Sequence, residues 1–290
     1  MRADSRCLIC HAMQALRVFN KYMRSEEEKW IRLQDILSVL EKLKWGLKPI
    51  EIAEIIYPEI EKIVGKRDVY EKEKKRSNEV ALKMLLKMER MIRESTDPLF
   101  DAAKLAIAGN LIDLGAPNWD EETVYRKILE ILERPFGIDD FEEFKEELSQ
   151  AGRIFYIVDN AGEIVFDKFF IEIMKEYNPS LEVVVAAKSK PIINDATVEE
   201  ARQIMDGVAQ VIDSGMQIPG AIVEKGSDAF RRLFFESDIV ISKGQGNFEG
   251  IIEEDNEKVY FLLTVKCPVV ADFLHVPERT MVFMKNKRKR

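Results

Sequence analysis

Ile154-Phe-Tyr-Ile-Val-Asp159-Asn160-Ala-Gly162-Glu163 is the stretch that decides the fold. Its apolar residues are rich in β-branched and aromatic side chains, which predicts a strand buried on both faces. Asp159 and Asn160 follow at the carboxyl end of this strand, where open α/β sheets bind their ligands. Gly162 permits a sharp turn, and Glu163 begins a predicted helix. A carboxylate beside a carboxamide suits a hard divalent cation that keeps some of its waters. The letters Asp-Asn-Ala-Gly are equally typical of an ordinary turn.

The chain changes character near residue 150. Residues 8 to about 148 repeat apolar side chains every three or four positions, which predicts one helix after another. Beyond Ala151, further apolar runs alternate with helical stretches: Val183–Ala187, Gln210–Ile212, Ile239–Ile241, Val259–Val265 and Met281–Met284. This alternation predicts a largely parallel sheet in a Rossmann-like, three-layer α/β/α arrangement. We therefore expect an α/β protein with a helical domain over residues 1–150, packed on a Rossmann-like domain over residues 151–290 that carries the site.

Composition limits the classes of function. The chain has 290 residues, 46% of them hydrophobic, and a net charge of −8. A substantial core is expected, and the negative charge disfavours a general nucleic-acid binder. No apolar run approaches the roughly 18 residues of a membrane span, and the N-terminus lacks the apolar segment of a secretory signal. We therefore expect a cytoplasmic protein without a membrane or nucleic-acid partner; the oligomeric state is left open.

The three cysteines are too few for a disulfide framework. Cys7-Leu-Ile-Cys10-His11 matches the pattern for covalent haem attachment. That attachment requires export, and we do not expect it here because the sequence shows no export signal. Helix one could fold back so that both thiols stand near Cys267, where they would bind a soft metal such as zinc or form a disulfide on oxidation. We favour the simpler interpretation of small buried side chains.

Polar residues follow nearly every predicted strand. In a parallel sheet the carboxyl ends converge on one edge, so these residues should share a rim: Asp159, Asn160, Lys188, Lys190, Asp195, Ser214, Gly215, Lys243, Gly244 and Lys266. Carboxylates that hold a cation, together with lysines that bind phosphate charge, are what metal-assisted phosphoryl chemistry requires. Asp195 taken alone is equally well explained as a helix N-cap.

Other chemistries fit less well. A phosphatase with an aspartyl nucleophile usually carries a second Asp two residues later, where this chain has Ala161. The turn over residues 244–250 resembles a dinucleotide-binding glycine loop, but the next strand ends without the acid that holds the ribose. A methyltransferase is disfavoured for the same reason, because its methyl-donor site would also need an acid that holds the ribose. A non-catalytic metal- or nucleotide-binding regulatory module is the remaining alternative.

Several motifs together resemble one known family. They are Asp159-Asn-Ala-Gly-Glu163, Asn194-Asp195, Ser242-Lys-Gly-Gln-Gly-Asn247 and Cys7-x-x-Cys10, with Asp97-Pro-Leu99 and Ala108-Gly-Asn-Leu-Ile-Asp113 in the helical half. The chain resembles the metal-dependent damage-control phosphatases, long known as domain of unknown function 89. The Cys-x-x-Cys pair is similar to that of an archaeal subgroup related to the phosphatase domain fused to some pantothenate kinases.

The resemblance implies a site and an activity. It implies one divalent ion (Mn²⁺, Co²⁺, Ni²⁺ or Mg²⁺) held by Asp159, Asn160 and Asp195, with Lys243 at the substrate phosphate and Lys266 as a second phosphate contact. Asn110 and Glu163 match positions near the pocket, and we expect Ser214, Gly215 and Gly244 to contact substrate. The implied substrates are small phosphorylated metabolites such as sugar phosphates, nucleotides or phosphopantetheine derivatives. Asp159, Asn160 and Lys243 are thus the predicted catalytic residues of a phosphatase that uses metal-activated water.

Overall fold

A computed structural model describes residues 1–109 and 121–287. Seven strands form one sheet: β1 (Ile138–Asp139), β2 (Arg153–Ile157), β3 (Glu182–Ala187), β4 (Gln210–Asp213), β5 (Ile239–Lys243), β6 (Val259–Thr264) and β7 (Met281–Lys285). Their order is β1-β7-β6-β5-β2-β3-β4, and every neighbouring pair is parallel except β6 and β7. The predicted α/β class and largely parallel sheet are confirmed. β1 was not predicted, because two residues make no recognisable apolar run.

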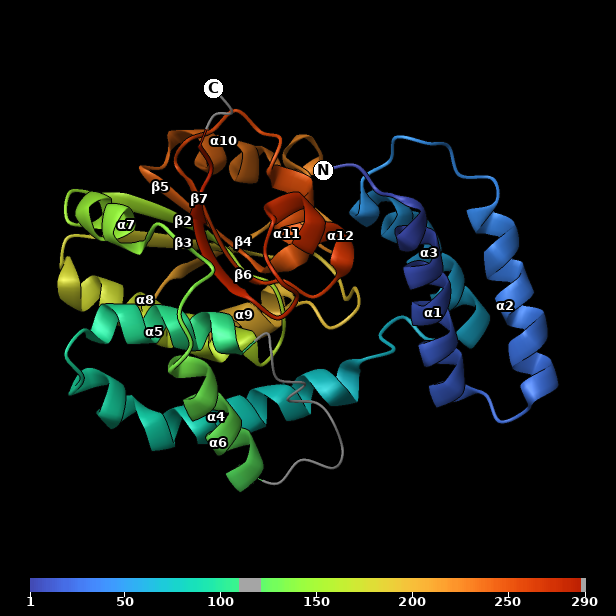
Figure 1. Cartoon of the computed structure of the whole chain (residues 1–290), viewed down its shortest axis with the longest axis horizontal. Helices are drawn as coiled ribbons and strands as arrows, with labels where there is room; N and C mark the ends of the chain where they lie inside the picture. Colours follow the sequence, from blue (N-terminus) through green and yellow to red (C-terminus); the bar gives the residue numbers. More distant parts are fainter. Residues whose placement is uncertain (110–120, 288–290) are drawn as a thin grey trace.

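The helices cover both faces of the sheet. They are α1 (Ser5–Tyr22), α2 (Glu26–Leu40), α3 (Pro49–Val64), α4 (Glu71–Arg93), α5 (Pro98–Ala108), α6 (Glu121–Leu132), α7 (Phe141–Leu148), α8 (Glu163–Tyr177), α9 (Val198–Ile204), α10 (Asp228–Glu236), α11 (Gly244–Ile251) and α12 (Pro268–Leu274), with a 3₁₀ turn at Val223–Lys225. Figure 1 shows α4, α5, α6 and α8 below the sheet and α1–α3 to one side, next to α11 and α12. None of the described helices is long and apolar enough to cross a membrane.

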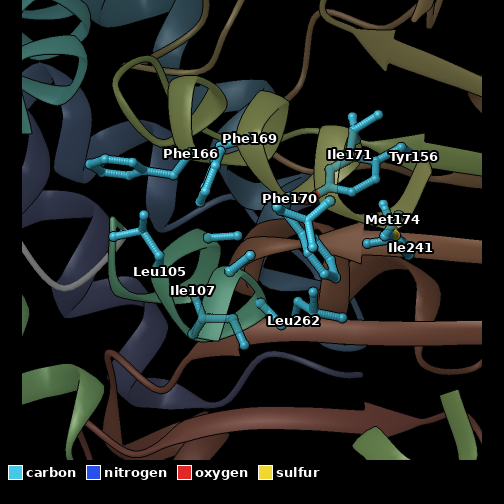
Figure 2. Packing of buried hydrophobic residues seen from close by; sticks show 14 of the residues in the cluster. Leu105, Ile107, Tyr156, Phe166, Phe169, Phe170, Ile171, Met174, Ile241 and Leu262 are labelled. Carbon is cyan, nitrogen blue, oxygen red and sulfur yellow. The ribbon is translucent and has the colours of Figure 1, made fainter. Parts of the chain in front are cut away.

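Strand alternation divides the core between the two faces. In β2, Ile154 and Tyr156 join one buried cluster, whereas Phe155 and Ile157 join the other, because successive side chains point to opposite sides of a sheet. The first cluster lies between the sheet and α5 and α8; Figure 2 shows Phe166, Phe169 and Phe170 of α8 packed against Leu105 and Ile107 of α5. The second cluster lies under α1, α3, α10 and α11. Both clusters contain residues from either side of residue 150.

The sheet has a topological switch point. From β2 the chain proceeds outward to β3 and β4, then returns to pair β5 with the other edge of β2 and continues to β6. The segments that follow β2 and β5 therefore diverge and leave a crevice between them, which is where open α/β sheets bind ligands. Asp159 and Asn160 follow β2, and Gly244 follows β5.

Candidate active site

A cavity of about 450 Å³ lies at this crevice. Its floor comes from loops at the strand ends and includes Asp159, Asn160, Asp195, Gly220, Gln245 and Lys266. Its wall comes from helices far away in the sequence, with Cys7, Cys10, His11 and Gln14 of α1 and Ile50 and Ala53 of α3. The helical region therefore does more than cover the sheet, because it closes the space above the polar floor.

The structure brings the three predicted metal ligands together. Asn160 and Asp195 form an isolated antiparallel β-bridge, reinforced by the bond from Ala196 N to the Asp159 carbonyl at 2.8 Å. Asn160 Nδ2 donates to Asp159 Oδ2 at 2.6 Å. This bond uses the nitrogen end of the amide, so the Asn160 oxygen remains available as a ligand. Two loops after different strands are thus joined by their backbones so that two carboxylates and one carboxamide share a small volume.

Asp195 lies in the cavity floor beside Lys188. Its carboxylate is buried, and Oδ2 lies 3.5 Å from Lys188 Nζ without a hydrogen-bond partner among the described residues. Burial raises its pKa to about 7; Lys188 opposes the shift, and the charge of Asp159 adds to it. Beyond the ion pair with Lys188, this buried oxygen has no hydrogen bond from the described part of the chain, and a buried polar atom without one is costly.

Gly244 makes room for Asp159. Its φ of +78° lies in the left-handed region, and a Cβ built there would stand 1.9 Å from Asp159 Oδ2. Any larger residue would therefore displace the carboxylate as well as strain the turn. The structure places Gly244 against a predicted ligand and not in the lining of the cavity.

Lys243 lies beneath the predicted metal-binding residues and does not reach the cavity. Its side chain is fully buried, and Nζ donates to the Ala106 carbonyl at 2.8 Å, to Glu163 Oε1 at 2.7 Å and to Asp167 Oδ1. Burial alone would lower the pKa of Lys243, but the two carboxylates outweigh it and raise that pKa. All three ammonium protons are used, so a direct contact with phosphate would require one of these bonds to be given up.

The buried Lys243 group connects to the floor through Glu163. Asn160 Nδ2 lies 3.3 Å from Glu163 Oε2, while Tyr156 donates to Asp167 Oδ1 at 2.7 Å. Burial raises the pKa of Glu163 to about 8; Lys243 opposes the shift, and Asp159 adds to it. Neither Glu163 nor Lys243 lines the cavity. In this geometry both residues support Asn160 from below.

The chain is similar to known proteins over almost its whole length. Residues 3–282 match the family model described as damage-control phosphatase ARMT1-like domain. A damage-control phosphatase of Pyrococcus horikoshii is 34% identical over the full length of both chains. The crystal structure of a DUF89 family protein from the same organism matches with a TM-score of 0.92 and 34% identity, covering 99% of this chain and 100% of that one.

The chain belongs to this family. An Archaeoglobus fulgidus damage-control phosphatase is 33% identical over 82% of this chain and 83% of its own length. Pantothenate kinase 2 of Arabidopsis thaliana is 29% identical over 50% of this chain, which is 18% of that protein. The predicted resemblance to the damage-control phosphatases, including a relative fused to a pantothenate kinase, is confirmed.

Other predicted residues of this damage-control phosphatase family member fall in different places. Lys266 is exposed and lines the cavity. Ser214 and Gly215 do not line it; they form a turn in which the Ser214 carbonyl accepts from Ser227 N at 2.8 Å. Asn110 lies outside the described residues. The substrate-binding roles of these residues stay predictions.

The cysteines lie together on one side of the cavity. Cys7 is buried, Cys10 is exposed and Cys267 is partly exposed, and all three are free thiols that line the cavity wall. Cys7 and Cys267 line the same cavity, and Arg6 Nη1 pairs with Asp272 at 2.7 Å, so helix one does fold back toward Cys267. Within the described ranges, however, no three His, Cys, Asp or Glu side chains are grouped to hold a metal ion.

Sequence reasoning missed two cavity residues, Gln245 and Glu249. Lys266 N donates to Gln245 Oε1 at 2.9 Å, which fixes the orientation of the amide, and Gln245 Nε2 then donates to Glu249 Oε1 at 2.9 Å. The spacing of Gln245 and Glu249 could have revealed them as a pair, because residues four apart share one face of a helix. The stretch 244–247 was interpreted as a turn, and that face was not considered.

Proposed function

We propose that this protein is a metal-dependent phosphatase that hydrolyses phosphate monoesters of small metabolites. Sugar phosphates, nucleotides and phosphopantetheine derivatives are the substrate classes we infer, and the cytoplasm is the compartment. The observation that supports this most directly is the convergence of Asp159, Asn160 and Asp195 at the floor of a cavity large enough for a small phosphate ester. The names of its relatives as damage-control phosphatases support the same reaction.

The donor set fits one divalent cation. Asp159 and Asp195 would supply charge, and the Asn160 oxygen would supply a neutral ligand, leaving positions for water and a phosphate oxygen. The unpaired Asp195 Oδ2 supports this assignment, because a cation there would satisfy a buried oxygen that the protein leaves without a hydrogen bond. When bound, Mn²⁺, Co²⁺, Ni²⁺ or Mg²⁺ would neutralise phosphate charge and make a water molecule more acidic.

The remaining tasks belong to side chains and helix ends of the protein. Lys266 stands at the cavity edge, where its ammonium group can bind a phosphate oxygen. Helix α8 begins directly after the loop that holds Asn160, and α11 begins directly after Lys243 at the end of β5, so their N-terminal amides favour negative charge at the floor. Lys243 and Glu163 hold Asn160 in place, and α1 and α3 exclude bulk water from above.

Phosphate release after metal removal tests the proposal. The protein is treated with a chelator and assayed with p-nitrophenyl phosphate and several sugar phosphates, with and without each of the four cations. We expect no turnover without metal and recovery when metal is restored. Inactivity with every cation on every ester would contradict the proposal. Tight binding of a phosphate ester without turnover would instead support a regulatory binding module.

A further inference from the structure

We infer that Glu249 is the general acid that protonates the leaving-group oxygen during phosphate-ester hydrolysis. The inference rests on the proposed phosphatase function. It concerns the step for which Asp159, Asn160, Asp195 and Lys266 provide no proton donor, since these groups bind the cation or the phosphate. Alkoxide leaving groups of sugar phosphates are strongly basic, so a positioned acid is valuable for such substrates.

Glu249 lies where it can reach the leaving group of a bound ester. Glu249 lies on α11, the helix that starts against Asp159, and its side chain lines the same cavity as Asp159 and Asp195. It is almost completely buried, so the cavity is the place where a ligand can reach it. Lys266 and Gln245 also line the cavity. An ester whose phosphate lies at the floor would therefore extend its leaving group along the wall that contains Glu249.

Hydrogen bonds around Glu249 fix the orientation of its carboxyl group. The Lys266 backbone N–H fixes the amide of Gln245, so Gln245 Nε2 is a donor, and it donates to Glu249 Oε1 at 2.9 Å and to Cys267 Sγ at 3.4 Å. Oε1 is thus an acceptor, and a proton on the carboxyl group belongs on Oε2. Among the described residues, no group hydrogen-bonds Oε2 and no cation stands within ion-pairing distance of the carboxyl group. Oε2 is left for a ligand.

The surroundings of Glu249 favour the neutral acid. Burial raises its pKa to about 7; the Gln245 bond and the Met1 ammonium group oppose the shift, and the charge of Asp159 adds to it. Cys7 and Cys267 line the cavity with this carboxyl group; burial raises the pKa of both thiols, and the charge of Glu249 adds to the shift. Met1 itself donates to the Glu249 backbone carbonyl and pairs with Glu253, so it does not neutralise the side chain directly.

In each reaction cycle Glu249 donates one proton and regains one. The bond between phosphorus and the leaving oxygen breaks as a water oxygen bonds to phosphorus, and the proton on Glu249 Oε2 moves to the leaving oxygen. The alcohol and inorganic phosphate are released, the attacking water loses its proton to solvent, and Glu249 takes one up from solvent. The net reaction consumes one water and returns Glu249 to its acid form.

The test compares leaving groups. Nitrophenolate leaves readily without a proton, whereas the alkoxide of glycerol phosphate or fructose 6-phosphate does not. We expect Glu249→Gln to lose about 10²–10³-fold in kcat/KM on the alkyl phosphates but only about threefold on p-nitrophenyl phosphate. In the wild type, kcat/KM on alkyl phosphates should fall as pH rises through the pKa of Glu249, and this decline should be absent in the variant.

Two controls separate chemistry from structure. Glu253→Gln makes the same substitution just past the end of the same helix, outside the cavity, and it should leave both activities and their ratio unchanged. A second measurement needs no turnover. The infrared spectrum of metal-free wild type minus that of metal-free Glu249→Gln should contain a protonated-carboxyl band at neutral pH, because the bands of Glu163 and Asp195 are common to both proteins and cancel. The melting temperature of each variant is recorded in parallel.

The outcomes are distinct. An equal loss of Glu249→Gln on both kinds of ester would overturn the inference, because it would indicate a structural role. Unchanged hydrolysis of alkyl phosphates, or no protonated carboxyl band at neutral pH, would overturn it as well. In each of these cases an active wild type leaves the proposed phosphatase intact. A wild type inactive on all esters would overturn the proposed function and this inference together.

Discussion

At the scale of single residues, Asp159 and Asp195 bring two negative charges into a buried floor. The raised pKa of Asp195, caused by burial and by Asp159, shows that the folded protein holds these carboxylates at a cost. Binding proteins and enzymes commonly accept such a cost at the site of function, because the ligand that relieves it gains affinity. Substitution of one ligand should therefore separate activity from stability.

Asp159→Asn keeps the size of the side chain and removes its charge. We expect turnover to fall on the order of 10²-fold or more, because a cation ligand is weakened, while the melting temperature stays equal or rises. Phosphatase assays and thermal unfolding measure both effects. Asp206→Asn, at an exposed position, should change neither. Wild-type turnover in Asp159→Asn would remove this residue from the mechanism.

Two lysines predicted to bind phosphate should respond in opposite ways. Lys243→Met leaves Glu163 and Asp167 buried without their cation and should cost about 3–5 kcal/mol of unfolding free energy. Lys266→Met should leave stability unchanged and raise KM about tenfold, because it removes a charged contact at the cavity edge. Denaturant unfolding and steady-state kinetics on both variants decide this. A stable Lys243→Met would contradict the structural role given to this lysine.

At the scale of elements, the strands and the loops that follow them were predictable, whereas side-chain direction was only partly used. Apolar runs located six strands, and the convergence of Asp159, Asn160 and Asp195 followed from parallel strand ends. Strand alternation could also have placed Lys243 on the face of Ile239 and Ile241, toward α5 and α8. Glu249 was missed because residues 244–247 were interpreted as a turn, so the helical face that Glu249 shares with Gln245 was not considered.

Gly244→Ala tests the turn between β5 and α11. The added methyl group would meet the Asp159 carboxylate, so we expect loss of cation binding and turnover along with a moderate loss of stability. Gly207→Ala is the matched control, because Gly207 also has a positive φ (+72°) but nothing lies within 4 Å of its Cβ position. Equal activity of the two variants would contradict displacement of Asp159 by the added methyl group.

Helix α1 contributes thiols to the cavity wall. Burial raises the pKa of Cys7 to about 11, so this thiol is protonated at neutral pH and is a poor metal ligand. We expect the double variant Cys7→Ser with Cys10→Ser to contain no less zinc than wild type, to keep its activity and to lose about 1 kcal/mol of stability. Metal analysis and melting curves give the answer. Lost zinc with a large fall in melting temperature would indicate a structural metal site.

At the scale of the whole molecule, two cores on opposite faces of one sheet hold the site between them. The layered fold could be predicted from alternating strands and helices, but the docking of α1 and α3 over the strand ends could not. Such docking depends on contacts between segments more than 200 residues apart, for which one sequence gives no periodic signal. The cavity wall, including His11 and Ile50, is therefore known only from the structure.

Phe170→Ala tests how strongly the layer of α5 and α8 supports the sheet. Phe170 is fully buried in the cluster of Figure 2, and its truncation should cost about 3–5 kcal/mol. Phe235→Ala is the control, because that ring is 54% exposed, and it should change stability by no more than about 0.5 kcal/mol. Similar losses in both variants would contradict the assignment of the core.

The sheet order has a consequence for the synthesis of the chain. β7 lies between β1 and β6, and the cavity combines Cys7 of α1 with Lys266 and Cys267, which follow β6. During translation α1 is synthesised first, and Lys266 and Cys267 are synthesised near the end. The nascent chain therefore contains α1 and the central strands long before the residues that complete the cavity. Phosphatase activity should therefore be absent from ribosome-bound chains stalled before β6 has emerged, and it should appear only once the segment after β6 can complete the cavity.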